Sequence, residues 1–342
     1  MMVARTLYLL VTAVVFGPVL AADLRWTPHP RNPVIANQNG FAGPYWNDPS
    51  VIRVGPTLVM YMSRNVGHIS DDHHVVPVRA ISHDGVSWSV DATPLLQPSP
   101  DPESFDGLRV ETPSVIFHQG VFHMYYSGIS RKGPGGPIAI GHAASVDGIH
   151  WTKDPGNPVL APSGNTSDWN GHHVGEPGAA VINGHVYVFF AAAGVNLEAS
   201  PPAVTRDIGF AVSKDGSRFG DQMVVLPRGR RYPASEGYEG YSTPEVVLFD
   251  GAIHIFYDVW KLTPGETAER TQVALHHAST RDGITWVEDA APIFTRGDFP
   301  WTAREIRAPA VMAIDDRVIM WFAGDDILNG GAGGIGVAVG RM

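Results

Sequence analysis

The chain has 342 residues and a formal net charge of −10, with 38 glycines, 28 prolines and no cysteine. The acidic balance argues against a nucleic-acid-binding protein, because phosphate binding requires clustered lysine and arginine. The lack of cysteine excludes thiol catalysis and cysteine-based zinc sites, whereas abundant glycine and proline suit many short strands joined by tight turns.

Residues 1–22 have the composition of a secretory signal peptide. Arg5 gives a positive start, Leu7 to Val15 is an apolar run, and Val19-Leu20-Ala21-Ala22 offers small residues for cleavage. The apolar run is short for a membrane span of about 20 residues, so we expect cleavage rather than an uncleaved anchor. The mature protein, residues 23–342, is therefore expected to be secreted or periplasmic and free of the membrane.

One phrase occurs five times after the first forty residues. Each copy has a proline, an apolar strand, a turn and a second apolar strand. A fixed period of short apolar strands indicates a repeated β-sheet unit. The prolines stand 64–67 residues apart, at Pro49, Pro113, Pro177, Pro244 and Pro309.

A second phrase, Asp-Gly followed by an aromatic residue, occurs in each of the first four units. Asp-Gly is a strong hairpin signal because glycine tolerates the positive φ of such turns. We expect the aromatic residue to pack between neighbouring sheets. The four copies begin at Asp84, Asp147, Asp215 and Asp282.

These phrases predict four strands in each unit, and four-stranded sheets repeated in a ring form a β-propeller. The fifth unit stops after Gly336-Val337-Ala338-Val339-Gly340 and lacks its outermost strand. Residues 24–35 match residues 149–160 and can supply that strand. We predict an all-β protein, a five-bladed β-propeller closed by the N-terminal strand, with one mature domain. Because closure leaves no open sheet edge, we expect a monomer.

Acidic residues stand at or near the starts of the inner strands, which converge on the propeller axis. A ring of carboxylates suits glycosidic cleavage, which needs one acid and one base or nucleophile. Mutual repulsion would raise some of their pKa values. The alternative is that these side chains only bond nearby backbone amides. The set comprises Asp48, Glu111 and Glu176 at nearly equivalent positions of blades one to three, Glu239 and Glu245 in blade four, and Glu305 in blade five.

Short motifs in these strands resemble the five-bladed propeller glycosidases. Trp46-Asn47-Asp48-Pro49 is similar to the motif that carries the nucleophile in glycoside hydrolase family 32, and Asp48-Pro49-Ser50-Val51 to the motif that carries the general base in family 43. Glu111-Thr112-Pro113 resembles the family 43 general-acid motif, which stands in a later blade there. Gly175-Glu176-Pro177 lies in blade three, where family 43 has its pKa-modulating acid and family 32 its acid. The resemblance implies that Asp48, Glu111 and Glu176 are catalytic and leaves open which glutamate is the acid.

The two families imply different chemistry. Family 43 implies an arabinose- or xylose-containing substrate, as for an arabinofuranosidase, with Asp48 as base and inversion. Family 32 implies fructans, with Asp48 as nucleophile and retention. We expect a glycoside hydrolase of oligo- or polysaccharides with the inverting mechanism. The alternatives are a non-catalytic carbohydrate-binding propeller and a phosphorolytic relative, for which Arg304 and Arg307 are the candidate phosphate ligands.

Other residues near the strand starts are candidates for substrate binding. Aromatic rings can stack on sugars, and arginines can orient hydroxyls or hold a carboxylate's charge. Ordinary packing and surface salt bridges are the alternatives. The set is Trp46, Asn47, Arg109, His172, His173, Glu239, Tyr241, Glu245, Glu305 and Arg307.

Three adjacent histidine pairs, at His73, His172 and His276, bear on metal binding. Neighbouring residues of a strand point to opposite faces, so a pair cannot easily share one zinc ion. We therefore expect no zinc and no required cofactor. The family 43 resemblance leaves calcium as a candidate.

Overall fold

The computed structural model describes residues 24–37, 45–66, 74–131, 137–196, 203–263, 269–314, 316–326 and 332–341. Within these ranges the protein is all-β, with two short 3₁₀ turns, η2 (Ala234–Glu236) and η3 (Pro300–Thr302). None of these residues forms a helix long and apolar enough to cross a membrane. The expected signal peptide, residues 1–22, lies outside the described residues.

The strands form antiparallel groups that follow one another along the chain. Group one contains β3 (Trp46–Val54), β4 (Thr57–Val66), β5 (His74–Ser82) and β6 (Ser89–Asp91). Group two contains β7 (Arg109–His118), β8 (Val121–Ile129), β9 (Ile138–Ser145) and β10 (Thr152–Lys153). Group three contains β11 (His173–Ile182), β12 (His185–Asn196), β13 (Ala203–Ser213) and β14 (Met223–Leu226).

The last two groups differ slightly in composition. Group four contains β15 (Tyr238–Phe249), β16 (Ala252–Thr263), β17 (Glu269–Thr280), β18 (Val287–Glu288) and β19 (Phe294–Thr295). Group five contains β20 (Glu305–Ile314), β21 (Arg317–Asp325) and β22 (Gly333–Arg341), together with β1 (Arg25–Pro28) and β2 (Ile35–Ala36) from the start of the chain.

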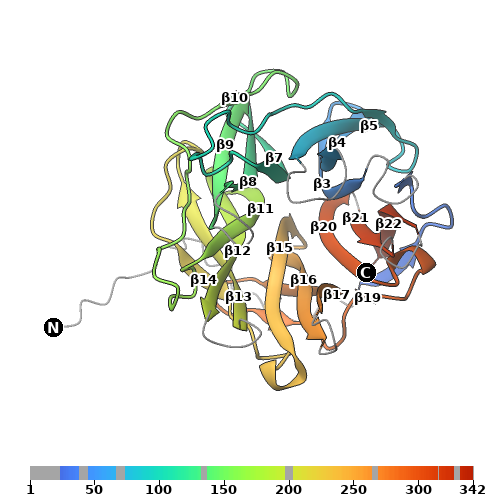
Figure 1. The fold of residues 1–342 in the computed structure, drawn as a ribbon. Helices are drawn as coiled ribbons and strands as arrows, with labels where there is room; N and C mark the ends of the chain where they lie inside the picture. Colours follow the sequence, from blue (N-terminus) through green and yellow to red (C-terminus); the bar gives the residue numbers. More distant parts are fainter. Residues whose placement is uncertain are drawn as a thin grey trace.

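The groups are arranged around a centre, and the blue strands of group one lie beside the red strands of group five (Figure 1). The first strands touch in a closed cycle, β3 with β7, β7 with β11, β11 with β15, β15 with β20, and β20 with β3. Single parallel bridges also join β9 to β11 and β13 to β15. The result is a propeller-like, all-β molecule whose first strands surround the centre.

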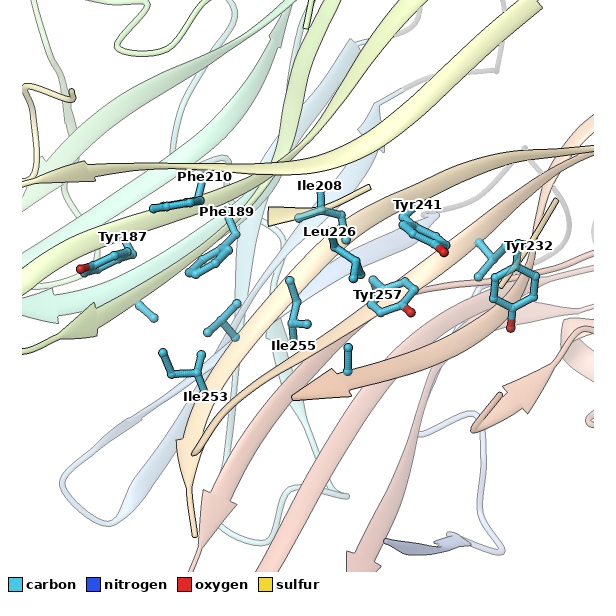
Figure 2. Close-up of a cluster of buried hydrophobic side chains, with 14 of the residues drawn as sticks. Tyr187, Phe189, Ile208, Phe210, Leu226, Tyr232, Tyr241, Ile253, Ile255 and Tyr257 are labelled. Carbon is cyan, nitrogen blue, oxygen red and sulfur yellow. The ribbon is translucent and has the colours of Figure 1, made fainter. Parts of the chain in front are cut away.

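Buried apolar side chains gather between successive groups. The described residues form five such clusters, one at each junction, including one between groups five and one. Figure 2 shows the cluster between groups three and four, where Ile208, Ile255 and Tyr257 are completely buried. Each large apolar side chain buried in this way stabilises the fold by about 1.5–3 kcal/mol. Packing between groups therefore holds the ring together.

Each first strand carries a β-bulge at the repeated proline. In group one, Asn47 pairs with Ser63 and Ser50 with Tyr61, so two residues oppose one. The residue before the proline has a positive φ in every group, which is uncommon without glycine. The bulge turns this residue towards the centre. The five residues are Asp48 (φ 49°), Thr112 (52°), Glu176 (53°), Thr243 (41°) and Ala308 (50°).

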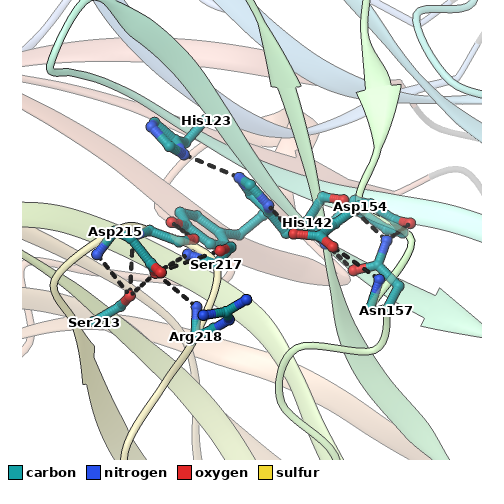
Figure 3. A network of polar contacts seen from close by, with 12 residues as sticks. His123, His142, Asp154, Asn157, Ser213, Asp215, Ser217 and Arg218 are labelled. Carbon is teal, nitrogen blue, oxygen red and sulfur yellow. Dashed lines mark hydrogen bonds and ion pairs between the residues drawn. The ribbon is translucent and has the colours of Figure 1, made fainter.

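The Asp-Gly phrases form tight turns, as expected. In group three, Asp215 accepts backbone N–H bonds from Ser217 and Arg218, and Gly216 has φ of 80° (Figure 3). The carbonyl of Gly216 accepts a hydrogen bond from the hydroxyl of Tyr125 in group two, at 2.6 Å. Trp321 donates in the same way to Gly85. Each of these turns therefore also fastens one group to the next.

The aromatic residue after each turn packs on the previous group, as the sequence predicts. Trp151 meets Tyr61 edge-on at 5.8 Å, and Phe219 meets Tyr125 at the same distance. Trp26 of β1 meets Phe256 of group four edge-on at 6.0 Å. Trp26 thus occupies in group five the position that the aromatic residue after the Asp-Gly turn occupies in the other groups.

The N-terminal segment pairs with the last strand. Arg25 to Pro28 pair with Arg341 to Ala338 of β22. The side chain of Asn32 bonds the backbone N–H and C=O of Val337, as the side chain of Asn157 bonds those of His142 in group two. The sequence match between residues 24–35 and 149–160 therefore corresponds to the same local structure.

Several histidines form buried hydrogen-bonded relays. In group two, His123 bonds His142 at 3.0 Å and His142 bonds Asp154 at 3.2 Å (Figure 3). Group four repeats this chain with His254, His277 and Asp289. Burial lowers the pKa of His123 to about 4, so both rings of the first relay stay neutral at neutral pH.

Candidate active site

Three carboxylates from three groups meet around the centre. Asp48 and Glu176 occupy the same bulge position, immediately before the proline, whereas Glu111 stands one residue earlier in its strand. The three positions are thus close to equivalent but not identical, which refines the sequence prediction. Each side chain is only partly exposed. The charge of Asp48 acts on both glutamates, and that of Glu111 on Glu176, so the three carboxyls form one electrostatic unit.

Asp48 belongs to group one, and its carboxyl interacts with residues of groups two and five. The hydroxyl of Thr112 donates to Asp48 Oδ2 at 3.5 Å. Burial raises the pKa of Asp48, while the charge of Arg307 and the hydroxyls of Ser63 and Thr112 oppose the rise. Asp48 therefore has the donors and the cation that stabilise a carboxylate, as a base or nucleophile requires.

Both glutamates have raised pKa values. Burial raises the pKa of Glu111 to about 7, against the charge of Arg109. Burial also raises the pKa of Glu176 to about 7, where Arg206 opposes the rise and Asp258 adds to it. A carboxyl that titrates near neutral pH can donate a proton to a leaving group.

Asp258 in β16 is a central acid that the sequence analysis missed. Its side chain is fully buried and accepts hydrogen bonds from the hydroxyls of Ser242 and Thr243 and, at 3.1 Å, from the backbone N–H of Ala308. Burial raises the pKa of Asp258. A signal existed, because Asp258 falls at the register position that Ser63 holds in group one.

Arg307 sits at the centre of a polar cluster between groups five and one. It donates to Asn47 Oδ1 at 3.0 Å and to the hydroxyl of Tyr45, and it forms ion pairs with Glu305 and Asp325. Asn47 and Glu305, both predicted to bind substrate, are thus partners of Arg307. Arg307 is 9% exposed, and its charge acts on Asp48 and Asp258.

Arg206 in β13 is a second residue that the sequence analysis missed. Its guanidinium lies 4.3 Å from the centroid of the Trp260 ring, and its charge acts on Glu176 and His173. The indole N–H of Trp260 in turn donates to Ser242 Oγ at 2.6 Å. A stacked arginine therefore connects the carboxyl of Glu176 to the hydrogen bonds around Asp258.

His173 is the histidine nearest the acids. Its Nε2 lies 3.9 Å from Glu176 Oε2, and burial lowers its pKa well below the usual value. A neutral His173 adds no positive charge that would ionise Glu176. His172 is partly exposed, and its backbone N–H bonds Ala193. Arg109 is partly exposed, and its charge acts on Glu111.

Two predicted sugar-stacking residues belong to the core instead. Tyr241 is fully buried, and its hydroxyl bonds Glu288 at 3.2 Å. Trp46 is 8% exposed and packs in the cluster between groups five and one, with the guanidinium of Arg64 at 5.9 Å from its ring centroid. Neither ring offers an open face to a sugar, because strand alternation directs both side chains into the packing between groups.

Glu239 pairs with an arginine, and Glu245 shares a small cavity with Asp48. Glu239 is buried and bonds Arg270 at 2.8 Å. Glu245 follows its proline, accepts the backbone N–H of Val311, and has its pKa raised to about 8 by burial. Glu245 lines a cavity of only about 20 Å³ beneath the bulges, together with the five repeated prolines. This space holds about one water, so the prolines form the floor of the site.

No metal-binding site is evident in the part of the chain that the structure describes. No three histidine, aspartate or glutamate side chains there are placed to hold an ion.

Comparison with known proteins finds structures of similar fold and one short segment of similar sequence. No protein-family model matches the chain. A segment of 115 residues, 33% of this chain, is 31% identical to sucrose-6-phosphate hydrolase of Zymomonas mobilis subsp. mobilis and spans only 21% of that protein. The structure is similar to a glycosyl hydrolase from Bacteroides ovatus, with a TM-score of 0.67 and 14% identity over 92% of this chain and 93% of that one. It is also similar to β-1,2-mannobiose phosphorylase from Listeria innocua, with a TM-score of 0.66 and 12% identity over 92% and 96%.

Proposed function

We propose that the protein is a secreted or periplasmic glycoside hydrolase built as a five-bladed β-propeller that β1 closes. Its five groups of strands are the blades, and its substrate is an oligo- or polysaccharide. The observation that carries the proposal is the electrostatic unit of Asp48, Glu111 and Glu176, in which both glutamates have pKa values raised to about 7. The similarity in fold to glycosidases and phosphorylases supports this type of function.

Asp48 is the general base of the proposed mechanism. Burial raises the pKa of Asp48, and the charge of Arg307 and the hydroxyls of Ser63 and Thr112 oppose that rise. An ionised carboxylate in this position can remove a proton from the water that attacks the anomeric carbon.

Glu176 is the better candidate for the general acid, with Glu111 tuning its pKa. An inverting pair must stand roughly 6.5–9.5 Å apart to admit water. Glu111 lies in the group next to Asp48, whereas Glu176 lies one group further around the centre. Glu176 Oε2 also has no hydrogen-bond partner among the described residues. The proton of Glu176 is therefore free to pass to the leaving oxygen.

The substrate that we propose contains arabinose or xylose, as the family 43-like motifs imply. A fructoside cleaved with retention is the second candidate, with Asp48 as nucleophile. The similarity to a sucrose-6-phosphate hydrolase favours this second candidate, because sucrose carries a fructosyl unit.

Hydrolysis fits the site better than phosphorolysis. Phosphate binding requires a guanidinium or ammonium group that is open to an anion. Arg307 is already paired with Glu305 and Asp325, and Arg304 with Glu269 and Glu305. Both candidate phosphate ligands are thus neutralised by carboxylates.

A substrate panel tests the proposal. Purified protein should hydrolyse at least one member of a set of aryl glycosides, arabinans, xylans and fructans. Asp48→Asn should lower kcat by at least about 10³-fold, because it removes the base, while the melting temperature changes little. Full activity in Asp48→Asn would refute its role, and binding without turnover across the panel would indicate a carbohydrate-binding protein.

The stereochemistry of the first product tests the mechanism. We expect ¹H NMR of an early time point to show the anomer opposite to that of the substrate. A first product that keeps the configuration of the substrate would make Asp48 a nucleophile.

A further inference from the structure

Arg206 is a cation beside the candidate general acid. It belongs to β13 and pairs with Ala193 of β12, which in turn pairs with His173 of β11. Directly paired residues direct their side chains to the same face of a sheet, and two strand spacings amount to about 10 Å. His173 Nε2 lies 3.9 Å from Glu176 Oε2. Among the neighbouring charges, that of Arg206 therefore acts most strongly on both His173 and Glu176.

The guanidinium of Arg206 is held in place without a carboxylate. It lies 4.3 Å from the centroid of the Trp260 ring, and the indole N–H of Trp260 donates to Ser242 Oγ at 2.6 Å. Stacking on an aromatic ring fixes the position of a guanidinium and leaves its N–H groups unused. The side chain of Arg206 has no hydrogen bond or ion pair with any residue that the structure describes.

The outer part of the guanidinium is open to a ligand. Arg206 is partly exposed, and of its three side-chain nitrogens only Nε is a buried atom that lacks a partner. The two terminal nitrogens therefore keep accessible surface. These nitrogens can donate the paired N–H bonds with which arginine binds a carboxylate.

The positive charge of Arg206 also lacks compensation in the proposed mechanism. The pKa of Glu176 is raised to about 7, and Glu176 is protonated when it acts as the acid. Below that pH it does not neutralise Arg206. Four other arginines, in contrast, have a carboxylate partner: Arg228, Arg270, Arg304 and Arg307.

A single guanidinium matches an anion of one charge. A carboxylate is planar and accepts two parallel N–H bonds from one arginine. A phosphate monoester carries about two negative charges near neutral pH, which one arginine does not balance. The site therefore favours a carboxylate over a phosphate.

We propose that Arg206 binds the carboxylate of a uronic acid residue of the substrate, next to the bond that receives the proton of Glu176. The natural substrate is then an acidic oligo- or polysaccharide. The inference rests on the proposed function and extends it, because it names the substrate class of the same site.

Calorimetric titration at about pH 6, where Glu176 is protonated, tests the proposal. The protein is Asp48→Asn, or the unmodified chain if nothing is hydrolysed. The probes are trigalacturonate and xylotriose with a 4-O-methylglucuronate branch, each with its carboxyl-reduced, neutral counterpart. At least one acidic probe should bind about tenfold more tightly than its counterpart, equal to about 1.4 kcal/mol. High salt should reduce this preference.

Substitutions of Arg206 identify the cation. Arg206→Met removes the charge but keeps an apolar chain against Trp260, and it should abolish the preference while the neutral probes bind as before. Arg206→Gln is a second neutral variant and should behave in the same way. Arg206→Lys keeps the charge without the paired donors and should retain part of the preference.

Arg53→Met is the matched control. Arg53 is exposed at the opposite end of β3 from Asp48, and its side chain donates only to the backbone of Gly55 among the described residues. This variant removes the same charge from the protein and should leave the preference unchanged.

Three results would overturn the proposal. They are the failure of both acidic probes to bind, equal binding of the acidic and neutral probes, and a preference that persists in Arg206→Met and Arg206→Gln. Arg206 would then act only on Glu176, and its removal would move the basic limb of the kcat/KM–pH profile to higher pH. Inorganic phosphate that binds more tightly than both uronates, and is lost in Arg206→Met, would assign the site to phosphate instead.

The same titration separates this inference from the proposed function. An Arg206-dependent preference without hydrolysis of any glycoside would overturn the proposed function and keep the uronate site. Hydrolysis of a neutral glycoside, with equal binding of the acidic and neutral probes, would do the reverse.

Discussion

Asp258 shows how one residue in a repeat can change an active site. In groups one and two, Ser63 and Ser127 accept the backbone N–H of the bulge residue in the next group, at 2.8 and 2.7 Å. Asp258 does the same for Ala308 but brings a carboxyl into a place with no access to water. Its charge raises the pKa of Glu176. We therefore expect Asp258 to keep the general acid protonated.

Replacing Asp258 by serine tests this role, because serine serves at the same position in two other groups. The basic limb of the kcat/KM–pH profile should move to lower pH, since Glu176 loses a neighbouring negative charge and releases its proton earlier. The melting temperature should fall only modestly, as hydroxyls of Ser242 and Thr243 lose an acceptor at a cost of about 1–3 kcal/mol.

Asp258→Asn is the companion variant, which removes the charge and nearly keeps the size. It should move the basic limb in the same direction. A profile that is unchanged in both variants would mean that Asp258 serves only to join groups four and five.

The strand that carries Trp26 pairs with the last strand of the chain. β1 is the outermost strand of group five, although it comes first in the chain. Trp26 packs between Phe256 of group four and the backbone of Gly340. The same edge-on contact recurs at other junctions, as between Trp151 and Tyr61. A strand from one end of the chain thus completes a sheet built from the other end.

Removing this contact should destabilise the whole molecule. Trp26→Ala should lower the free energy of unfolding by about 2 kcal/mol, less than the 3–5 kcal/mol of a fully buried tryptophan because Trp26 is partly exposed. Urea denaturation followed by circular dichroism measures the change. Arg25→Ala, at an exposed position of β1, is the control.

A protein that lacks residues 24–37 should aggregate, because the free edge of β22 becomes available for pairing. A soluble truncated protein with unchanged stability would show that β1 is not required to close the ring.

Each of the five groups contributes a buried charged or ionisable side chain to the centre of the molecule. Glu245 shares a cavity of only about 20 Å³ with Asp48 and the five repeated prolines, and burial raises its pKa to about 8. The ring therefore supplies acids that titrate near neutral pH, and its own stability responds to the same pH range.

The raised pKa of Glu245 makes its contribution to the stability of the fold fall as the pH rises. The unfolded carboxyl releases its proton near pH 4.5, whereas the folded one keeps it until about pH 8. Stability from Glu245 is thus complete below pH 4.5 and is lost as the pH rises through 8. Glu245→Gln keeps an acceptor for Val311 without the charge, and should stabilise the protein by on the order of 1 kcal/mol at pH 8.5.

The same variant should have little effect on the unfolding free energy at pH 4.5, which chemical denaturation at the two pH values would show. An equal change at both pH values would mean that Glu245 acts through its size and hydrogen bond rather than through its proton.

The repeat itself was visible in the sequence, because short strands, prolines and Asp-Gly turns are local signals. The period of the prolines predicted repeated antiparallel sheets, and the match of residues 24–35 to residues 149–160 predicted the partner of β22. Asp48, Glu111 and Glu176 were predicted from the same alignment, although Glu111 stands one residue before the position that Asp48 and Glu176 occupy. These inferences needed only which residues occupy the same place in each repeat.

Only the tertiary structure decided which neighbours each side chain has. Trp46 and Tyr241 were predicted to stack on sugars but are buried between groups, while Arg206 and Asp258 act on the acids from positions that the motifs do not mark. The pKa values near 7 likewise arise from burial and from charges on other groups. Burial and Coulomb interactions depend on distances between residues far apart in the chain, and those distances exist only once the groups have packed around a common centre.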